Sequence, residues 1–148
     1  MSTLSDRFIT AFEDFQAEAA TINQKNGFTN QDSRLRQLQA YLIGLDRCEF
    51  LPLLEQYENA RIGLKLALVT SELSEALEAV RTNAEADDHI PDFTAEEAEI
   101  ADAVIRLMNY ATDRKLRLAD AIVAKNEYNR NRPDHRPENR AFPHGKKF

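Results

Sequence analysis

Apolar residues recur at intervals of three and four along most of the chain, which is the spacing of amphipathic helices. The first such segment runs from Leu4 to Lys25, and Gly27 behind it suits the left-handed position that closes a helix. A shorter segment runs from Leu35 to Leu45, and a break follows around Asp46 to Leu51. The pattern therefore predicts two helices joined by a short loop.

The longest periodic segment begins at Pro52, which suits the first turn of a helix, and runs to Thr82. Its main apolar stripe, which we expect to face the core, consists of Ile62, Leu66, Val69, Leu73, Leu77 and Val80. After a polar loop, Thr94 and Glu97 have the spacing of a capping box that starts another helix. The core stripe expected on that helix consists of Ile100, Val104, Leu107, Met108 and Ala111.

A break near Lys115 precedes a final helix over Leu118 to Arg132, and a proline-containing tail, Pro133 to Phe148, is expected to be extended. Helices joined by short connections favour an all-α antiparallel bundle. We predict four or five helices in one domain, residues 1–132, followed by the tail.

Composition narrows the class of protein. The net charge of −6 argues against a nucleic-acid binder, which would present a basic face. Cys48 is the single cysteine, so an intramolecular disulfide and a cysteine-based zinc cluster are excluded. The sequence has no secretory core at its start and no apolar run of membrane-spanning length, so the expectation is a cytoplasmic protein without membrane contact.

Two pairs of acidic residues carry the candidate chemistry. Glu72 and Glu75 are three residues apart, as are Glu99 and Asp102, and residues at this spacing share a helix face. If the two helices pack side by side, four carboxylates converge and repel one another unless their pKa values rise or a cation binds. Oxygen ligands alone favour a hard cation, so Mg²⁺ is the expected metal and Mn²⁺ the alternative.

A solvated acidic surface is the competing interpretation, because 25 acidic residues produce such pairs by chance. Asp102 and Arg106 would then form an ordinary surface ion pair. Glu72 and Glu75, however, align with the apolar Leu68 and Ala79, which is unlike a solvated face. This second apolar stripe predicts a homo-oligomer, either a dimer or a tetramer.

The residues around the acidic pairs resemble a known family. "KLALVTSELSEALEAVR", "EEAEIADAVIRLMNYA" and the ending "LADAIVAKNEYNRNRP" with "HGKK" are similar, in that order, to the MazG-like all-α nucleoside triphosphate pyrophosphohydrolases. The motif core of the resemblance covers residues 63–132. Ser71 departs from it where many members carry a further glutamate, and Lys115 stands where a helix-ending glycine is common.

The resemblance implies a Mg²⁺-dependent enzyme that cleaves a nucleoside triphosphate to the monophosphate and pyrophosphate, for nucleotide-pool control or housecleaning. It implies four metal ligands: Glu72, Glu75, Glu99 and Asp102. Glu75 would also orient or deprotonate the attacking water, and Lys125 would offset charge on the leaving pyrophosphate. Lys125, Asn129 and Arg132 match positions that contact phosphate or sugar.

Two alternatives stay open. One is a non-catalytic helical adaptor or a structural cation-binding bundle, and the other is the same fold acting on a phosphoribosylated nucleotide. The histidines lie outside the acidic pairs. We expect His89 and His135 to be exposed to solvent, and His144 belongs to the "HGKK" of the tail.

Overall fold

The computed structural model of the chain describes residues 3–27, 30–45 and 47–132. Those residues form helices without any strand, which confirms the predicted all-α class. The helices are α1 Leu4–Lys25, α2 Asn30–Gly44, the 3-10 helix η1 Cys48–Phe50, α3 Leu51–Thr82, α4 Ala95–Asp113 and α5 Leu118–Arg130. None of the described helices has both the length and the apolar character needed to cross a membrane.

The helix boundaries follow local signals in the sequence. Gly27 closes α1 with a φ of 79°, in the left-handed region. Pro52 lies in the first turn of α3. Thr94 caps α4 by accepting a hydrogen bond from the backbone N–H of Glu97, whose side chain in turn accepts from the backbone N–H of Thr94. All three predicted signals are therefore confirmed.

The turn that follows α4 has a lysine at a position whose backbone conformation favours glycine. Lys115 has a φ of 53°, in the left-handed region that glycine adopts without strain. Its backbone N–H donates to the carbonyl of Thr112 at 3.0 Å, so the turn is formed despite the side chain. A lysine in this conformation costs about 1 kcal/mol relative to glycine.

The described chain consists of two compact units. One is Gln16–Lys115, which holds α2, η1, α3, α4 and the second half of α1. The other joins Met1–Phe15 to Leu116–Phe148 and holds α5 with the first half of α1. The predicted tail, Pro133–Phe148, lies outside the described residues.

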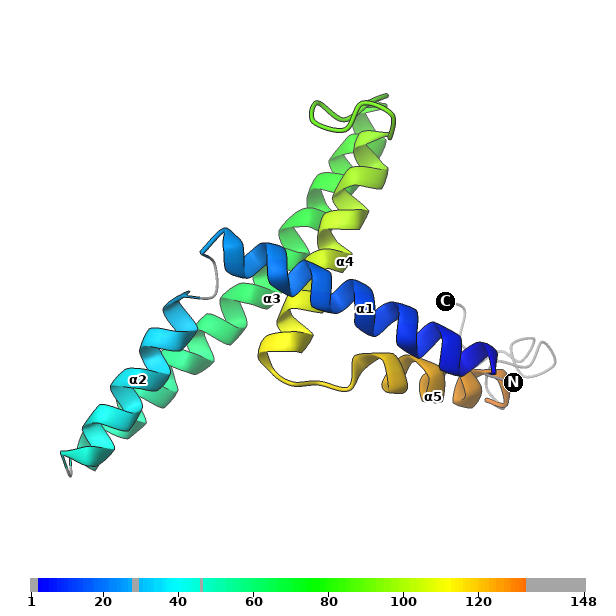
Figure 1. The fold of residues 1–148 in the computed structure, drawn as a ribbon. Helices are drawn as coiled ribbons and strands as arrows, with labels where there is room; N and C mark the ends of the chain where they lie inside the picture. The colour runs from blue at the N-terminus through cyan, green and yellow to red at the C-terminus, as the bar shows by residue number, and fades with distance from the viewer. Residues whose placement is uncertain (1–2, 28–29, 46, 133–148) are drawn as a thin grey trace, which may run out of the picture. The chain divides into compact units, whose positions relative to one another are not determined.

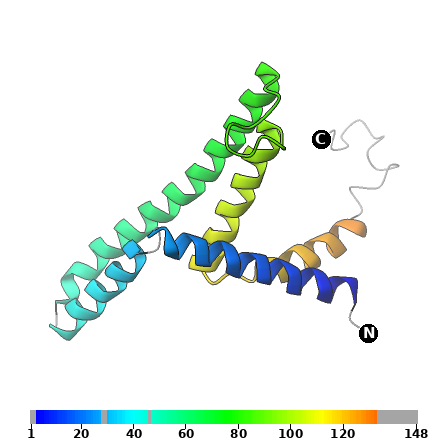
Figure 2. The same cartoon turned by 45° about the horizontal axis from the view of Figure 1, so that its top comes forward.

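Helix α3 is the long axis of the first unit. Helix α2 runs antiparallel beside its first part and α4 runs antiparallel beside its second part (Figures 1 and 2). The contact between α3 and α4 is the most extensive in the unit. Lys65 of α3 forms an ion pair with Asp113 of α4 at 2.5 Å, and Gln16 donates a hydrogen bond to Thr112 at 2.8 Å. The first of these contacts joins the two helices that carry the acidic pairs, at the end of α4 far from Glu99.

Small side chains form the buried part of this unit. Its buried apolar residues are Ala19, Val69, Ala76, Ala79, Ala103, Met108 and Ala111. No large side chain is completely buried among the described residues. Because alanine faces bring two helix backbones close together, α3 and α4 pack tightly with few bulky groups between them.

The predicted core stripes require a correction. Val69, Met108 and Ala111 are buried as expected, but seven bulky members of the two stripes are between 40% and 60% exposed. We call these seven the aliphatic face: Leu66, Leu73, Leu77, Val80, Ile100, Val104 and Leu107. The reason is rotational, because the helices meet through their alanines and this turns the larger aliphatic side chains to one flank of the pair.

Candidate metal centre

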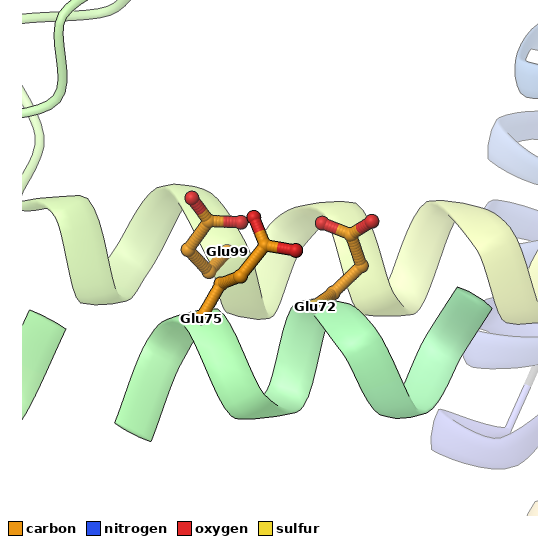
Figure 3. Close-up of side chains that lie close together, drawn as sticks. All are labelled: Glu72, Glu75 and Glu99. Atoms are coloured by element: carbon orange, nitrogen blue, oxygen red, sulfur yellow. The ribbon is translucent and has the colours of Figure 1, made fainter. Parts of the chain in front are cut away.

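Three of the four predicted metal ligands meet between α3 and α4. Carboxylate oxygens of Glu72, Glu75 and Glu99 all lie within 4.8 Å of one another, and the three groups emerge on the same side of the helix pair (Figure 3). The spacing of three residues aligns the two glutamates of α3, and the packing of α4 brings the third to them. We call Glu72, Glu75 and Glu99 the carboxylate triad.

Glu72 is the buried member of the triad, with a side chain that is 7% exposed. Its Oε1 forms an ion pair with Nε of Arg106 at 2.6 Å, and this contact compensates the desolvated charge. The sequence suggested a surface ion pair between Arg106 and Asp102. The structure instead pairs Arg106 with Glu72, because the side chain of Arg106 extends across the helix interface.

Glu75 is the exposed member of the triad. The hydroxyl of Ser71 donates a hydrogen bond to its Oε1 at 3.0 Å, one helical turn away. Ser71 is the residue that replaces a further glutamate in the resemblance. In this chain it orients a carboxylate of the triad and adds no charge to it.

The surroundings of Glu99 disfavour its ionised form. Desolvation raises the pKa of Glu99, and a side-chain hydrogen bond with Glu72 raises it further. The negative charges of Glu75, Glu72 and Asp102 act in the same direction. The triad is therefore a place that favours either a proton or a cation.

Glu99→Gln is expected to stabilise the metal-free protein at neutral pH. The folded-state pKa of Glu99 lies above the ordinary 4.5, so the folded wild type binds more protons than the unfolded chain in the interval between the two values. Wild-type stability therefore falls as pH rises through that interval, and the variant avoids this loss. Urea unfolding in a metal chelator should show an advantage that is absent near about pH 4 and present above the interval. Glu96→Gln, at an exposed site of the same helix, is the control, and equal stability of Glu99→Gln and wild type at all pH values would contradict the prediction.

Asp102 lies outside the triad, although its charge reaches Glu99. Its side chain is exposed and lines a cavity of about 490 Å³ formed by α1, α3 and α4. Arg106 lines the same cavity, so the cavity adjoins the triad through this one side chain. The structure thus places the fourth predicted ligand at the border between triad and cavity.

The cavity was not foreseen from the sequence. Two further cations, Arg61 and Lys65, line it together with Tyr110 and Asn109. The Oδ1 atom of Asn109 is buried and has no hydrogen-bond partner. A buried amide oxygen without a partner is costly, so the hydrogen-bonding capacity of this side chain is unmet. Only the packing of α1 on the other two helices reveals this arrangement.

The three predicted substrate-binding residues, Lys125, Asn129 and Arg132, belong to the other compact unit. The ammonium of Lys125 lies 4.9 Å from the ring centre of Tyr128, and the guanidinium of Arg132 lies 5.7 Å from the same ring. The Oδ1 atom of Asn129 is buried and has no hydrogen-bond partner. Tyr128, which gathers two of the three predicted residues, was missed because aromatic residues near a helix end are common.

The predicted exposure of the histidines is confirmed at one position. The side chain of His89 is 92% exposed, and its nearest charged partner is Asp87 at 4.0 Å. His135 and His144 lie outside the described residues.

Comparisons with protein-family models, with curated proteins and with solved structures find no match to this chain. The support for a functional site therefore comes from the geometry of the carboxylate triad and of the cavity beside it.

Proposed function

We propose that the protein is a Mg²⁺-dependent nucleoside triphosphate pyrophosphohydrolase of the MazG-like class, acting in nucleotide-pool control or housecleaning. The observation that carries the proposal is the carboxylate triad, in which Glu72, Glu75 and Glu99 converge from two helices. The resemblance of the motif core to that family supports the same reading. The substrate is a nucleoside or deoxynucleoside triphosphate, cleaved to the monophosphate and pyrophosphate.

The donors of the triad fit a hard divalent cation. All are carboxylate oxygens, which Mg²⁺ and Mn²⁺ prefer over nitrogen or sulfur ligands. Desolvation, followed by the hydrogen bond with Glu72 and the neighbouring carboxylates, raises the pKa of Glu99, and a bound cation would relieve this cost of ionisation. A cation bound there supplies positive charge against the phosphate oxygens of a substrate. Asp102, at the edge of the triad, is the proposed fourth ligand.

The residues of the chain then have separate roles. Glu75 is exposed and oriented by Ser71, so its carboxylate is suited to accept a proton from the attacking water. Lys125 offsets charge on the leaving pyrophosphate, and Asn129 and Arg132 contact phosphate or sugar. The cavity beside the triad has the size of a small-ligand site, and its exposed polar groups suit a nucleoside.

The proposal includes an architecture and an assembly. Antiparallel pairing of α3 with α2 and α4 is the core of the proposed four- to five-helix bundle. The working unit is a homo-oligomer, a dimer or a tetramer, because the aliphatic face is too large a bulky apolar surface for a lone chain to expose. The cytoplasm, without nucleic-acid or membrane partners, is the proposed location.

One observation favours a second candidate. The aliphatic face would equally serve a non-catalytic helical adaptor in which the triad binds a structural cation. A third candidate keeps the fold and the chemistry but acts on a phosphoribosylated nucleotide. The three candidates differ in whether a substrate is hydrolysed and in which products form.

A panel of nucleoside and deoxynucleoside triphosphates with Mg²⁺, extended by phosphoribosylated nucleotides, tests the proposal. We expect pyrophosphate from at least one triphosphate, and no turnover in excess chelator because the charge supplied by the cation is removed. Pyrophosphate and orthophosphate are measured separately in each reaction. Orthophosphate as the sole primary product would contradict the proposal, and the absence of turnover across the panel would favour the adaptor.

A further inference from the structure

Arg106 is shared between the carboxylate triad and the cavity. Its Nε forms an ion pair with Glu72 at 2.6 Å, while its side chain is 42% exposed and lines the cavity. Glu72, in contrast, is 7% exposed and has little access to water. The ion pair is therefore buried at one end and open at the other.

The partner of Glu72 must change when a cation binds. A buried carboxylate needs a compensating charge, and Arg106 supplies it in the metal-free protein. This inference rests on the proposed function in one respect, namely that a divalent cation binds the triad. Such a cation compensates Glu72 by itself, and it repels a guanidinium held at hydrogen-bond distance from the same carboxylate.

The cavity offers Arg106 another position. Lys65 also lines the cavity, but it pairs with Asp113, which lies outside the triad. Arg106 is different because its partner is itself a member of the triad. Its long side chain and planar fork suit the oxygens of a phosphate group.

We propose that Arg106 is a displaceable counter-ion that couples metal binding to ligand binding. In the metal-free protein it neutralises Glu72. When a divalent cation occupies the triad, Arg106 leaves Glu72, turns into the cavity and binds the phosphate groups of the ligand. Metal and phosphate then favour each other's binding through this residue, and the coupling is reciprocal.

Arg106→Gln should change two affinities in opposite directions. Mn²⁺ binding, followed by electron paramagnetic resonance, should tighten by roughly tenfold, because a competing positive charge is removed. Binding of inorganic pyrophosphate to the Mn²⁺-loaded protein, followed by calorimetry, should weaken by roughly tenfold, because a charged hydrogen-bond donor is lost. A fixed positioning residue would instead weaken both affinities when removed, and that result overturns the proposal.

Two matched variants make the comparison specific. Lys65→Gln removes a cation from the same cavity without touching the triad, so its Mn²⁺ affinity should stay within about twofold of wild type. Arg106→Lys keeps the charge and should remain close to wild type for Mn²⁺. If Lys65→Gln tightens Mn²⁺ binding as much as Arg106→Gln does, the effect is a general one of net charge and the proposal is wrong.

The wild-type protein gives a test that does not depend on the folding of a variant. In nitrogen-15 spectra, the Nε–H of Arg106 should exchange slowly with water in chelator, because the guanidinium is paired with the buried Glu72. Saturating Mg²⁺ should shift this resonance and speed its exchange, and added pyrophosphate should slow it again. The resonance is assigned by its loss in Arg106→Lys, and a resonance that Mg²⁺ leaves unchanged overturns the proposal.

These measurements separate the inference from the proposed enzyme activity. If the opposite changes occur but no nucleotide is hydrolysed, the counter-ion exchange is supported and the pyrophosphohydrolase is not. If nucleotide is hydrolysed and Arg106→Gln lacks the opposite changes, the pyrophosphohydrolase proposal is supported and the counter-ion exchange is contradicted. A wild-type protein that binds no Mn²⁺ overturns the exchange as well.

Discussion

Glu72→Gln is expected to abolish divalent-cation binding and to lower the rate of pyrophosphate release at least about a hundredfold, because a catalytic metal supplies several kcal/mol of charge stabilisation. Glutamine keeps the shape of the side chain but lacks the charge that a hard cation requires. Glu72 is the buried member of the triad, so solvent cannot replace it as a ligand. Mn²⁺ titration, pyrophosphate release and circular dichroism together measure the loss and show that the helices persist.

Glu78→Gln provides the control for this prediction. Glu78 lies on the same helix, is exposed and pairs with Arg81 at 3.2 Å, outside the triad. Its replacement should leave cation binding and rate within about twofold of wild type, as expected for an exposed ion pair. Asp102→Asn then distinguishes a three-carboxylate from a four-carboxylate site. Near-normal binding and rate in Glu72→Gln would return the acidic pairs to a solvated-surface interpretation.

The helices could be predicted from sequence because their signals are local. The capping box at Thr94, the proline at the start of α3 and the left-handed Gly27 each act through neighbouring residues. The expected break around Asp46 to Leu51 contains the 3-10 helix Cys48–Phe50. None of these features needs a distant partner, and a single sequence is sufficient for them.

The orientation of the helices could not be predicted in the same way. Helix α3 has bulky aliphatic residues and alanines on adjacent faces, and the hydrophobic pattern alone favours the bulky face as the core. The structure packs α4 against the alanines, including Ala76 and Ala79, and exposes Leu73 and Leu77. Close backbone approach decided the packing, and periodicity does not measure that.

The candidate site could also be predicted only in part, because helical spacing is local and helix packing is not. The spacing of three residues placed Glu72 beside Glu75, and the assumption that two helices are neighbours placed Glu99 with them. The partner of Arg106 and the cavity depend on which helix faces meet, so they required the structure. Asp102 is three residues from Glu99, yet it lies outside the triad, so spacing along a helix does not by itself determine which carboxylates meet.

The surface through which copies of the chain would associate also differs from the one expected. The sequence suggested the stripe of Leu68 and Ala79, but Ala79 is buried in the single chain. On a helical wheel the aliphatic residues of α3 are centred well away from Glu72 and Glu75, and those of α4 are centred well away from Glu99 and Asp102. A second copy related by two-fold symmetry would cover this face with its own and leave both triads accessible.

Leu73→Lys combined with Val104→Lys is expected to convert an oligomer into single chains. The two residues come from different helices of the aliphatic face, and a stable pair buries about 800 Å² per chain, so two charges at the centre of such a surface oppose association strongly. Sedimentation at micromolar concentration should give a multiple of the 16.9 kDa chain mass for wild type and the mass of one chain for the variant. Ile43→Lys combined with Leu53→Lys, at positions that are more exposed and lie outside the face, should keep the wild-type mass. Mn²⁺ affinity of the dissociated variant should stay near that of wild type, since neither substituted residue belongs to the triad. A fully active wild type of single-chain mass would show that copies of the chain do not cover this face.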